Sequence, residues 1–409
     1  MNRITVLATV VLMSAVTSRA ADWPQWLGPN RDGISAESDW SAKWASGGPK
    51  KLWSKSIGIG FGSMSVGDGR VYTMGHRGGQ ETVFCFDANT GKEIWKESYP
   101  AQLVNRLHEG GPSSTPTIDG DRVFTVGKDG KFMCFEAANG KVVWTIDLVK
   151  EFRVKVPEWG FCSSPLILGN LVIVEAGPTV AYAKATGKMV WKSSMYKAAY
   201  GSAMAFEQNG KTLIASLNSM GLVILDAKNG REISRVPWKT QYDTNSTTPL
   251  IVDDTIFIST GYGKGCGLFQ VRGGKLTKIY TNKTMANHFN NSVLVDGHLY
   301  GFNGNSHRSS KVSLVCMEFK TGKEKWRETG LLGCGSLIAA DGKLIVLSDR
   351  GVLYVAEASP KGFLPTARAQ LVGDAKDRRN RCWTIPVLAN GKIYARNARG
   401  DLVCADVGK

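Results

Sequence analysis

The 409-residue sequence lacks most motifs that identify a particular chemistry. It has no Gly-x-Ser-x-Gly nucleophile motif, no phosphate-binding P-loop, no Cys-x-x-Cys-His haem attachment site and no cluster with zinc-ligand spacing. Histidine is also scarce, with five residues in the whole chain. These absences argue against a nucleophile-elbow hydrolase, a P-loop nucleotidase, a zinc protein and a protein that carries its own c-type haem.

Long apolar runs are missing as well, apart from one at the N-terminus. Residues 4–16 are apolar, follow the basic Arg3, and precede Ser18-Arg19-Ala20, which resembles a signal-peptide cleavage site. A membrane-spanning helix needs about 20 apolar residues, and this run is shorter. The first cysteine is Cys85, so no cysteine for lipid attachment lies near the cleavage site. We predict a signal peptide over residues 1–20, no membrane span, and an exported protein that is periplasmic or extracellular.

Negative charge is in short supply. The formal net charge is +16, with 51 Lys and Arg against 35 Asp and Glu. Such an excess favours anionic partners, for example an acidic glycan or a lipid headgroup. The basic residues are scattered rather than grouped in runs, which fits a solvated basic surface equally well and indicates no specific nucleic-acid binding.

A repeated phrase dominates the rest of the chain. An acidic or small residue is followed by a Thr-Gly or Asn-Gly turn, a lysine and, three residues later, a tryptophan. Copies lie at residues 87–95, 136–144, 183–191 and 318–326, and a degraded copy without the tryptophan lies at 226–234. Each copy predicts two strands joined by a tight turn. A period of about 40 to 50 residues indicates stacked units of one architecture.

An earlier hairpin precedes each copy, as in residues 115–124 and 385–394. Aligning these hairpins yields eight equivalent positions, 40 to 52 residues apart: Tyr72, Phe124, Ile173, Leu213, Phe257, Tyr300, Ile345 and Tyr394. Each unit then has four short strands, as in a propeller blade. The last unit ends after its third strand, while residues 51–56 resemble an outer strand. We therefore predict an all-β, eight-bladed β-propeller of four-stranded antiparallel blades, closed by an N-terminal strand. A seven-bladed ring with an aberrant insertion is the alternative.

The cysteines follow the same repeat. Cys85, Cys134, Cys316 and Cys404 occupy one repeat position, and equivalent positions of different blades lie beyond the roughly 7 Å Cα separation that a disulfide spans. We predict that these four are small buried core residues and that most thiols are free.

The Asp-x-x-Thr-Gly-Lys-x-x-Trp repeat resembles the docking motif of the pyrroloquinoline quinone (PQQ)-like propeller family, over about residues 50–407. That family includes quinoprotein alcohol dehydrogenases and an outer-membrane assembly lipoprotein. The leader at residues 22–33 is similar to the start of secreted members. The resemblance implies that Trp95, Trp144, Trp191 and Trp326 pack between blades. The predicted organisation is a signal peptide (1–20), a leader (21–50) and the propeller (51–409).

Loops on one face of such a ring surround its central channel. They carry residues suited to an anionic or multiply oxygenated ligand: His108, Trp159, His288, Asn290, Arg378, Arg381 and Trp383. A second set of residues lies three residues before each aligned inner-strand position and faces the channel: Phe61, Ser113, Cys162, Ser202, Ser246, Phe289, Cys334 and Trp383. Trp383 and Phe289 either stack on a flat ligand or plug the channel.

These features predict a non-catalytic binding or scaffolding module, and a monomer. Its partner would be a protein segment, an anionic small molecule or a glycan. The partner would bind on the basic funnel, which is the face whose loops surround the central channel. The alternative is a small quinoprotein oxidoreductase that uses PQQ and calcium to oxidise an alcohol or sugar. Against it, the sequence lacks the adjacent cysteine pair of the family's alcohol-oxidising members. Glu109, Glu158, Asp243 and Asn290 offer oxygen ligands for calcium without forming a recognisable motif. A third reading is binding of acidic polysaccharide outside the cell.

Overall fold

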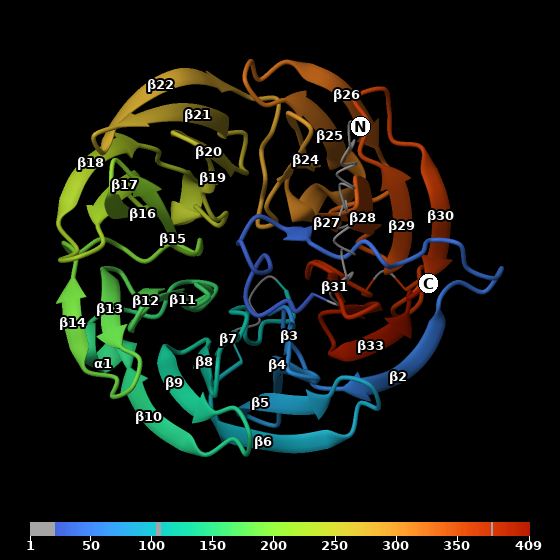
Figure 1. Ribbon diagram of the computed structural model, residues 1–409, viewed down its shortest axis with the longest axis horizontal. Coiled ribbons are helices and arrows are strands. Elements are labelled where there is room, and N and C mark those ends of the chain that lie inside the picture. Colours follow the sequence, from blue (N-terminus) through green and yellow to red (C-terminus); the bar gives the residue numbers. More distant parts are fainter. Residues whose placement is uncertain (1–20, 104–107, 378) are drawn as a thin grey trace, which may run out of the picture.

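The computed structural model describes residues 21–103, 108–377 and 379–409, so the predicted signal peptide and Arg378 lie outside the described residues. Eight antiparallel sheets stand around a central axis, and the chain proceeds from one to the next around the ring (Figure 1). The eight-bladed propeller prediction is confirmed, and the seven-bladed alternative is wrong.

The blades follow one another in chain order, each with its first strand innermost. Blade one contains β3 (Ser65–Gly67), β4 (Arg70–Arg77), β5 (Gln80–Asp87) and β6 (Glu93–Pro100). Blade two contains β7 (Thr117–Asp119), β8 (Arg122–Val126), β9 (Lys131–Glu136) and β10 (Val142–Asp147), followed by a short helix, α1 (Leu148–Phe152). Blade three contains β11 (Leu166–Leu168), β12 (Leu171–Glu175), β13 (Thr179–Ala183) and β14 (Met189–Lys192). Blade four contains β15 (Met204–Gln208), β16 (Lys211–Asn218), β17 (Gly221–Asp226) and β18 (Glu232–Pro237).

The second half of the ring repeats this plan. Blade five contains β19 (Leu250–Val252), β20 (Thr255–Thr260), β21 (Gly265–Arg272) and β22 (Lys275–Asn282). Blade six contains β23 (Val293–Val295), β24 (His298–Asn303), β25 (Ser313–Glu318) and β26 (Glu324–Thr329). Blade seven contains β27 (Ser336–Ala340), β28 (Lys343–Leu347), β29 (Val352–Glu357) and β30 (Pro365–Gln370). Two 3-10 turns, η1 (Gln241–Asp243) and η2 (Ser306–Lys311), lie in loops.

The ring closes through strands from both ends of the chain. β31 (Val387–Ala389), β32 (Lys392–Arg396) and β33 (Asp401–Asp406) form three strands of blade eight, and β2 (Lys50–Ser56) pairs antiparallel with β33 as the fourth. Trp53 of β2 lies opposite Cys404 in this pairing. A closed ring leaves no outer strand of blade eight missing, which removes an open sheet edge.

The repeated phrase proves to be an inter-blade joint. In blade one, the indole N–H of Trp95 donates to the carbonyl oxygen of Ala137 in blade two, at 2.9 Å. The ring lies over Gly140, where an added Cβ would come within 2.6 Å of the indole, and Gly140 also has a positive φ of 76°. Glycine is therefore required at this turn by both space and backbone conformation. The same glycine-on-indole contact joins blades eight and one, two and three, and three and four.

All eight cysteines are unpaired thiols in the structure. Cys85, Cys134, Cys316 and Cys404 are each fully buried, on the third strands of their blades. This agrees with the prediction that they are small core residues.

The leader before β2 is the main feature that the repeat pattern did not reveal. It crosses the centre of the ring in Figure 1 instead of lying on the outside. Trp23 forms a two-way backbone pairing with Val66 of blade one, and the carbonyl of Pro24 accepts from Ile118 of blade two at 2.8 Å. Trp23 is 0% exposed, so this segment is part of the core.

Further along, the leader reaches the other side of the ring. Buried Arg31 donates to the carbonyl of Pro165 at 3.1 Å, before blade three. β1 (Ile34–Ser35) adds a parallel fifth strand to β27 of blade seven, and the Ser35 hydroxyl donates to Leu388 O of blade eight at 3.1 Å. The leader thus ties together the inner strands of opposite blades.

Candidate functional site: a central aromatic cup

A cavity of about 460 Å³ occupies the axis of the propeller. It is lined by the rim loops, which we define as the loops that precede the innermost strand of each blade, together with turns after the second strands. Trp26 of the leader also lines it and donates from its indole N–H to the Thr248 hydroxyl at 3.0 Å. We call this cavity on the axis the central cup.

Aromatic rings form a chain of contacts around the cup. Trp159 contacts Tyr200 and Tyr242, with ring centroids 5.6 and 6.3 Å away, and Tyr242 contacts Tyr262 at 5.6 Å. Tyr262 in turn contacts His288 at 5.0 Å. All of these except Tyr242, which stands more than half exposed, line the cavity itself.

The chain of rings continues on the opposite side. His288 contacts Phe289 at 5.0 Å, and Phe289 contacts Trp383 at 5.0 Å. Trp383 stacks on Phe61 at 5.4 Å, with the ring planes 20° apart. His108 meets Phe61 edge-on at 5.2 Å. Rings from blades one to six and blade eight therefore form one continuous aromatic surface, since the rim loops converge on the axis.

The predicted channel-facing set lines this cavity with one exception. Phe61, Phe289 and Trp383 supply aromatic surface, and the remaining members, Ser113, Cys162, Ser202 and Ser246, are small. Cys334 does not line the cavity; it is 2% exposed and packs in the core between blades six and seven. The small residues leave the open volume at the centre of the cup.

Two histidines in the cup are held in the neutral form. The backbone N–H of Gly110 donates to His108 Nδ1 at 3.0 Å, and that of Ser306 donates to His288 Nδ1 at 3.1 Å. Burial is the main cause that lowers the pKa of each ring to about 4. With Nδ1 accepting, the proton of the neutral ring resides on Nε2, so each imidazole has one N–H donor remaining.

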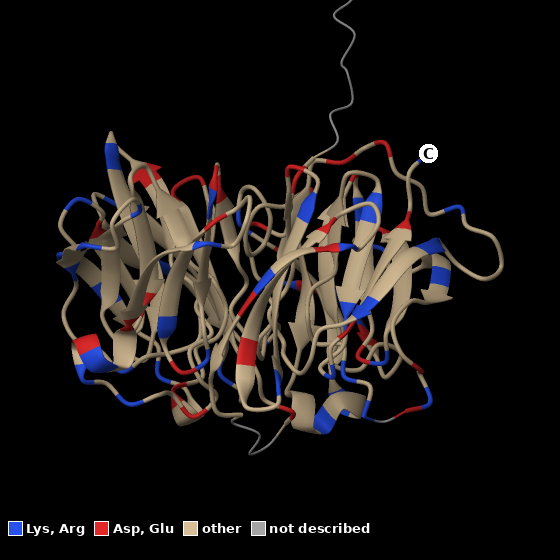
Figure 2. Ribbon diagram, turned by 90° about the horizontal axis from the view of Figure 1, so that it is seen from below, with Lys and Arg blue, Asp and Glu red and all other residues tan. Residues whose placement is uncertain are grey.

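The rim arginines lie beside carboxylates. Arg381 donates to Glu109 at 2.8 Å and places its guanidinium 5.4 Å from the Trp383 ring centroid. Arg379 and Arg399 both pair with Asp377, at 3.2 and 3.1 Å. In the view of Figure 2, basic and acidic residues are interspersed rather than segregated. The ion pairs at the rim place a carboxylate beside each of these three arginines.

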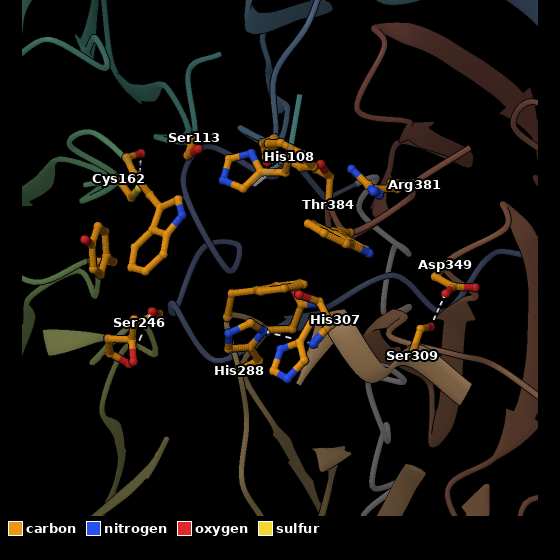
Figure 3. Close-up of a pocket in the computed structure, with 18 of the residues that line it drawn as sticks. His108, Ser113, Cys162, Ser246, His288, His307, Ser309, Asp349, Arg381 and Thr384 are labelled. Carbon is orange, nitrogen blue, oxygen red and sulfur yellow. Dashed lines mark hydrogen bonds between the residues drawn. The ribbon is translucent and has the colours of Figure 1, made fainter. Parts of the chain in front are cut away.

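The structure brings most of the predicted site residues to one cavity. His108, Trp159, His288, Asn290, Arg381 and Trp383 all line the cup, and Figure 3 shows His108, His288 and Arg381 around its opening. Asn290 is only 5% exposed, and its amide donates to Gly335 O at 2.7 Å, which fixes its orientation. Arg378 lies outside the described residues.

Sequence reasoning missed several lining residues. Among them, Trp26 belongs to the leader, Tyr262 to a glycine-rich turn after the second strand of blade five, and Ser309 and Asp349 to separate blades. The Ser309 hydroxyl donates to Asp349 (Figure 3). The one available signal was Tyr262, a large aromatic residue flanked by glycines.

The cup does not supply a calcium site for a quinone cofactor. Ca²⁺ takes six to eight oxygen ligands. No group of three or more His, Cys, Asp or Glu residues in the described ranges is arranged to hold a metal ion. Of the oxygen ligands that the sequence offered, Glu109 is paired with Arg381, and Asp243 lies 3.6 Å from Lys197. These residues do not fit calcium-held PQQ.

Comparisons with known proteins match the fold. A family profile described as outer membrane protein assembly factor BamB matches residues 40–145 and 82–328. No curated protein matches the sequence. None of the helices in the described part of the chain has the length and hydropathy needed to cross a membrane.

Solved structures with this architecture are distant in sequence. BamB from Moraxella catarrhalis is 15% identical, with a TM-score of 0.60 over 87% of this chain and 97% of that one. Quinohemoprotein alcohol dehydrogenase from Comamonas testosteroni is 13% identical, with a TM-score of 0.66 over 96% of this chain and 82% of that one. The related enzyme ADHIIG from Pseudomonas putida HK5 is 12% identical, with a TM-score of 0.69 over 95% and 80%. At such identities the likeness establishes the fold alone.

Proposed function

Since the chain belongs to the family of PQQ-like propellers described as outer membrane protein assembly factor BamB, we propose that it is an exported, non-catalytic binding module whose binding site is the central cup. The name of that family refers to the assembly of outer-membrane proteins, and the predicted signal peptide agrees with export from the cytoplasm. The partner on this surface is a protein segment, a small molecule or a glycan.

The continuous aromatic surface of the cup is the observation that carries this proposal. Trp383, Phe61 and Phe289 come from three blades, and Trp383 contacts each of the two phenylalanines within a cavity of about 460 Å³. Small-ligand sites are concave, largely apolar, and about 300 to 1,000 Å³ in volume, with a few polar groups that set orientation. Aromatic anchors of this kind contribute most of the affinity at binding sites.

The oxidoreductase alternative has less support. The enzymes among the structural neighbours share the fold at 12 and 13% identity. Fold alone does not carry activity. Glu109 and Asp243 are paired with Arg381 and Lys197, and no group of three or more His, Cys, Asp or Glu residues among the described residues is arranged to hold a metal ion. A quinone–calcium pair is therefore left without a suitable ligand set.

A calorimetric titration of the mature protein with PQQ, with and without calcium, separates the two functions. We expect no calcium-dependent binding and no reduction of an artificial electron acceptor with alcohols or sugars. Calcium-dependent binding at micromolar concentration, together with acceptor reduction, would establish the oxidoreductase instead.

Binding in the cup is tested with a panel of defined probes: neutral and acidic trisaccharides, tripeptides and nucleosides. We expect at least one class to bind saturably and to lose affinity in Trp383→Ala. Trp44→Ala is the matched control, because Trp44 lies in the leader outside the cup, and its indole N–H donates to the nearby Ser41 carbonyl. A panel without any Trp383-dependent binding would refute the module as proposed.

A further inference from the structure

The wall of the cup has two chemically different halves. Phe61, Phe289 and Trp383 stand on the half formed by blades one, six and eight. The corresponding positions of blades two to five are Ser113, Cys162, Ser202 and Ser246. Figure 3 shows Ser113, Cys162 and Ser246 on one side of the opening, with Arg381 and Thr384 on the other. A ligand at the centre therefore meets the rings of Trp383, Phe61 and Phe289 on one side, and on the other side small polar groups beside Trp159 and Tyr200.

The aromatic half is a surface rather than a slot. Trp383 contacts both Phe61 and Phe289 directly, with ring centroids 5.4 and 5.0 Å apart, so the rings fill the space between themselves. An aromatic ligand sandwiched between two of these rings would have to separate them. The arrangement instead suits a ligand that packs one aliphatic face on the rings. Weakly positive C–H groups are attracted to the negative face of an aromatic ring.

The polar groups of the cup are mostly uncharged. Serine hydroxyls both donate and accept hydrogen bonds, and neutral His108 and His288 each retain an Nε2–H donor. Two arginines line the cup: Arg381 is paired with Glu109 at 2.8 Å, and the Nε of Arg350 lies 3.8 Å from the neighbouring carboxylate of Asp349. An anionic ligand would have to compete with one of these carboxylates for a guanidinium. A ligand rich in hydroxyl groups matches the uncharged donors and acceptors without disturbing either ion pair.

This inference rests on the proposed function: we propose that the ligand of the central cup is an uncharged sugar ring of an oligosaccharide. One C–H face of the ring packs on Trp383 and Phe61, and its hydroxyl groups bond to the serine half of the wall and to the imidazole N–H groups. This assigns the site to neutral glycan, in place of the anionic ligand that net charge alone suggests.

The probes for this inference are cellotriose, maltotriose, mannotriose and N,N′,N″-triacetylchitotriose, compared with trigalacturonate, adenosine and Gly-Trp-Gly. Calorimetry on the mature protein should show binding of at least one neutral trisaccharide. Its affinity should change less than twofold between 0.05 and 0.5 M salt, because screening has little effect on an uncharged ligand. Trigalacturonate, adenosine and the peptide should bind at least tenfold more weakly.

Variants locate the binding. Trp383→Ala should weaken trisaccharide binding at least tenfold, while Trp383→Phe should retain most of the affinity because an aromatic face remains. The double variant Ser113→Ala, Ser246→Ala changes only small side chains and should also weaken binding severalfold. Trp44→Ala should bind as the wild type does. A melting curve for each variant distinguishes lost contacts from lost folding, and the serine variant provides a second test if Trp383→Ala does not fold.

The outcomes distinguish the sugar assignment from the proposal that the cup is the binding site. If trigalacturonate, adenosine or the peptide binds in a Trp383-dependent way and no neutral trisaccharide does, the sugar assignment is refuted while the cup remains the binding site. If a trisaccharide binds equally well to Trp383→Ala and the serine variant, its site lies elsewhere and the assignment also fails. If no probe binds, both proposals fail.

Discussion

Replacing Trp95 tests the joint that holds neighbouring blades together. The side chain is 7% exposed, and its ring lies 5.8 Å from both Tyr72 and Phe135. Emptying a buried aromatic site typically costs 3 to 5 kcal/mol. We therefore expect Trp95→Ala to lower the free energy of unfolding by about 3 to 5 kcal/mol.

Two phenylalanine variants separate the packing of the ring from its hydrogen bond. Trp95→Phe keeps an aromatic ring but loses the 2.9 Å bond to Ala137 O. That carbonyl still accepts from Arg70 and Tyr72, so no acceptor is left unsatisfied and the bond should contribute about 1 kcal/mol. Trp191→Phe is the matched control, since the indole N–H of Trp191 has no partner among the described residues.

Urea denaturation measures these changes as shifts in midpoint at constant slope. We expect the order of destabilisation to be Trp95→Ala, then Trp95→Phe, then Trp191→Phe, with about 1 kcal/mol between the two phenylalanine variants. An unchanged midpoint for Trp95→Ala would refute the inter-blade role of the motif. Equal effects of the two phenylalanine variants would refute the contribution of the hydrogen bond.

The remaining predictions concern a buried carboxyl and the two ends of the chain. Burial raises the pKa of Glu175 from 4.5 to about 7, so the stability that its protonated form contributes is fully present below pH 4.5 and is lost as the pH rises through about 7. Melting curves should show that wild type loses about 3 kcal/mol of stability over this range and that Glu175→Gln does not. An identical pH profile for the two proteins would contradict the assignment. Trp23→Ala empties a fully buried leader site and should cost about 3 to 5 kcal/mol in urea denaturation; a wild-type midpoint would mean that the leader is dispensable. Trp53→Ala removes the 3.1 Å hydrogen bond to Ala88 O that links β2 to blade one, so limited proteolysis should cleave within residues 50–56 faster than in wild type. Equal cleavage rates in the two proteins would contradict the closure of the ring by β2.

The blades could be predicted from sequence because their signals are local. A two-residue turn such as Asp296-Gly297, with φ values of 46° and 74°, specifies a hairpin through residues that are adjacent in the chain. The tryptophan of the repeated phrase recurs at the blade period, and the family resemblance implied that it packs between blades. The contact with a glycine of the next blade was seen only in the structure. The closing strand followed from its likeness to other outer strands.

The candidate site was predictable only in part. His108, His288 and Trp383 occupy rim loops, and loop position relative to a repeat is readable from sequence. Trp26 was not found, because the leader carries no repeat signal that would direct it across the axis. The charge of the funnel was also misleading, since the sequence shows Arg381 but not the carboxylate that it meets.

The sequence by itself determined the strands, the turns, the number of blades and the burial of the repeat cysteines, since each depends on patterns within about 50 residues. Only the tertiary structure decided the cup. The Trp26–Thr248 bond joins residues 222 apart in sequence, and the Glu109–Arg381 pair joins residues 272 apart. Such partners meet only when the ring closes, because closure brings the rim loops of distant blades to one axis. The place of Trp26 in the cup, the aromatic surface and the ion pairs of the site are therefore properties of the closed ring.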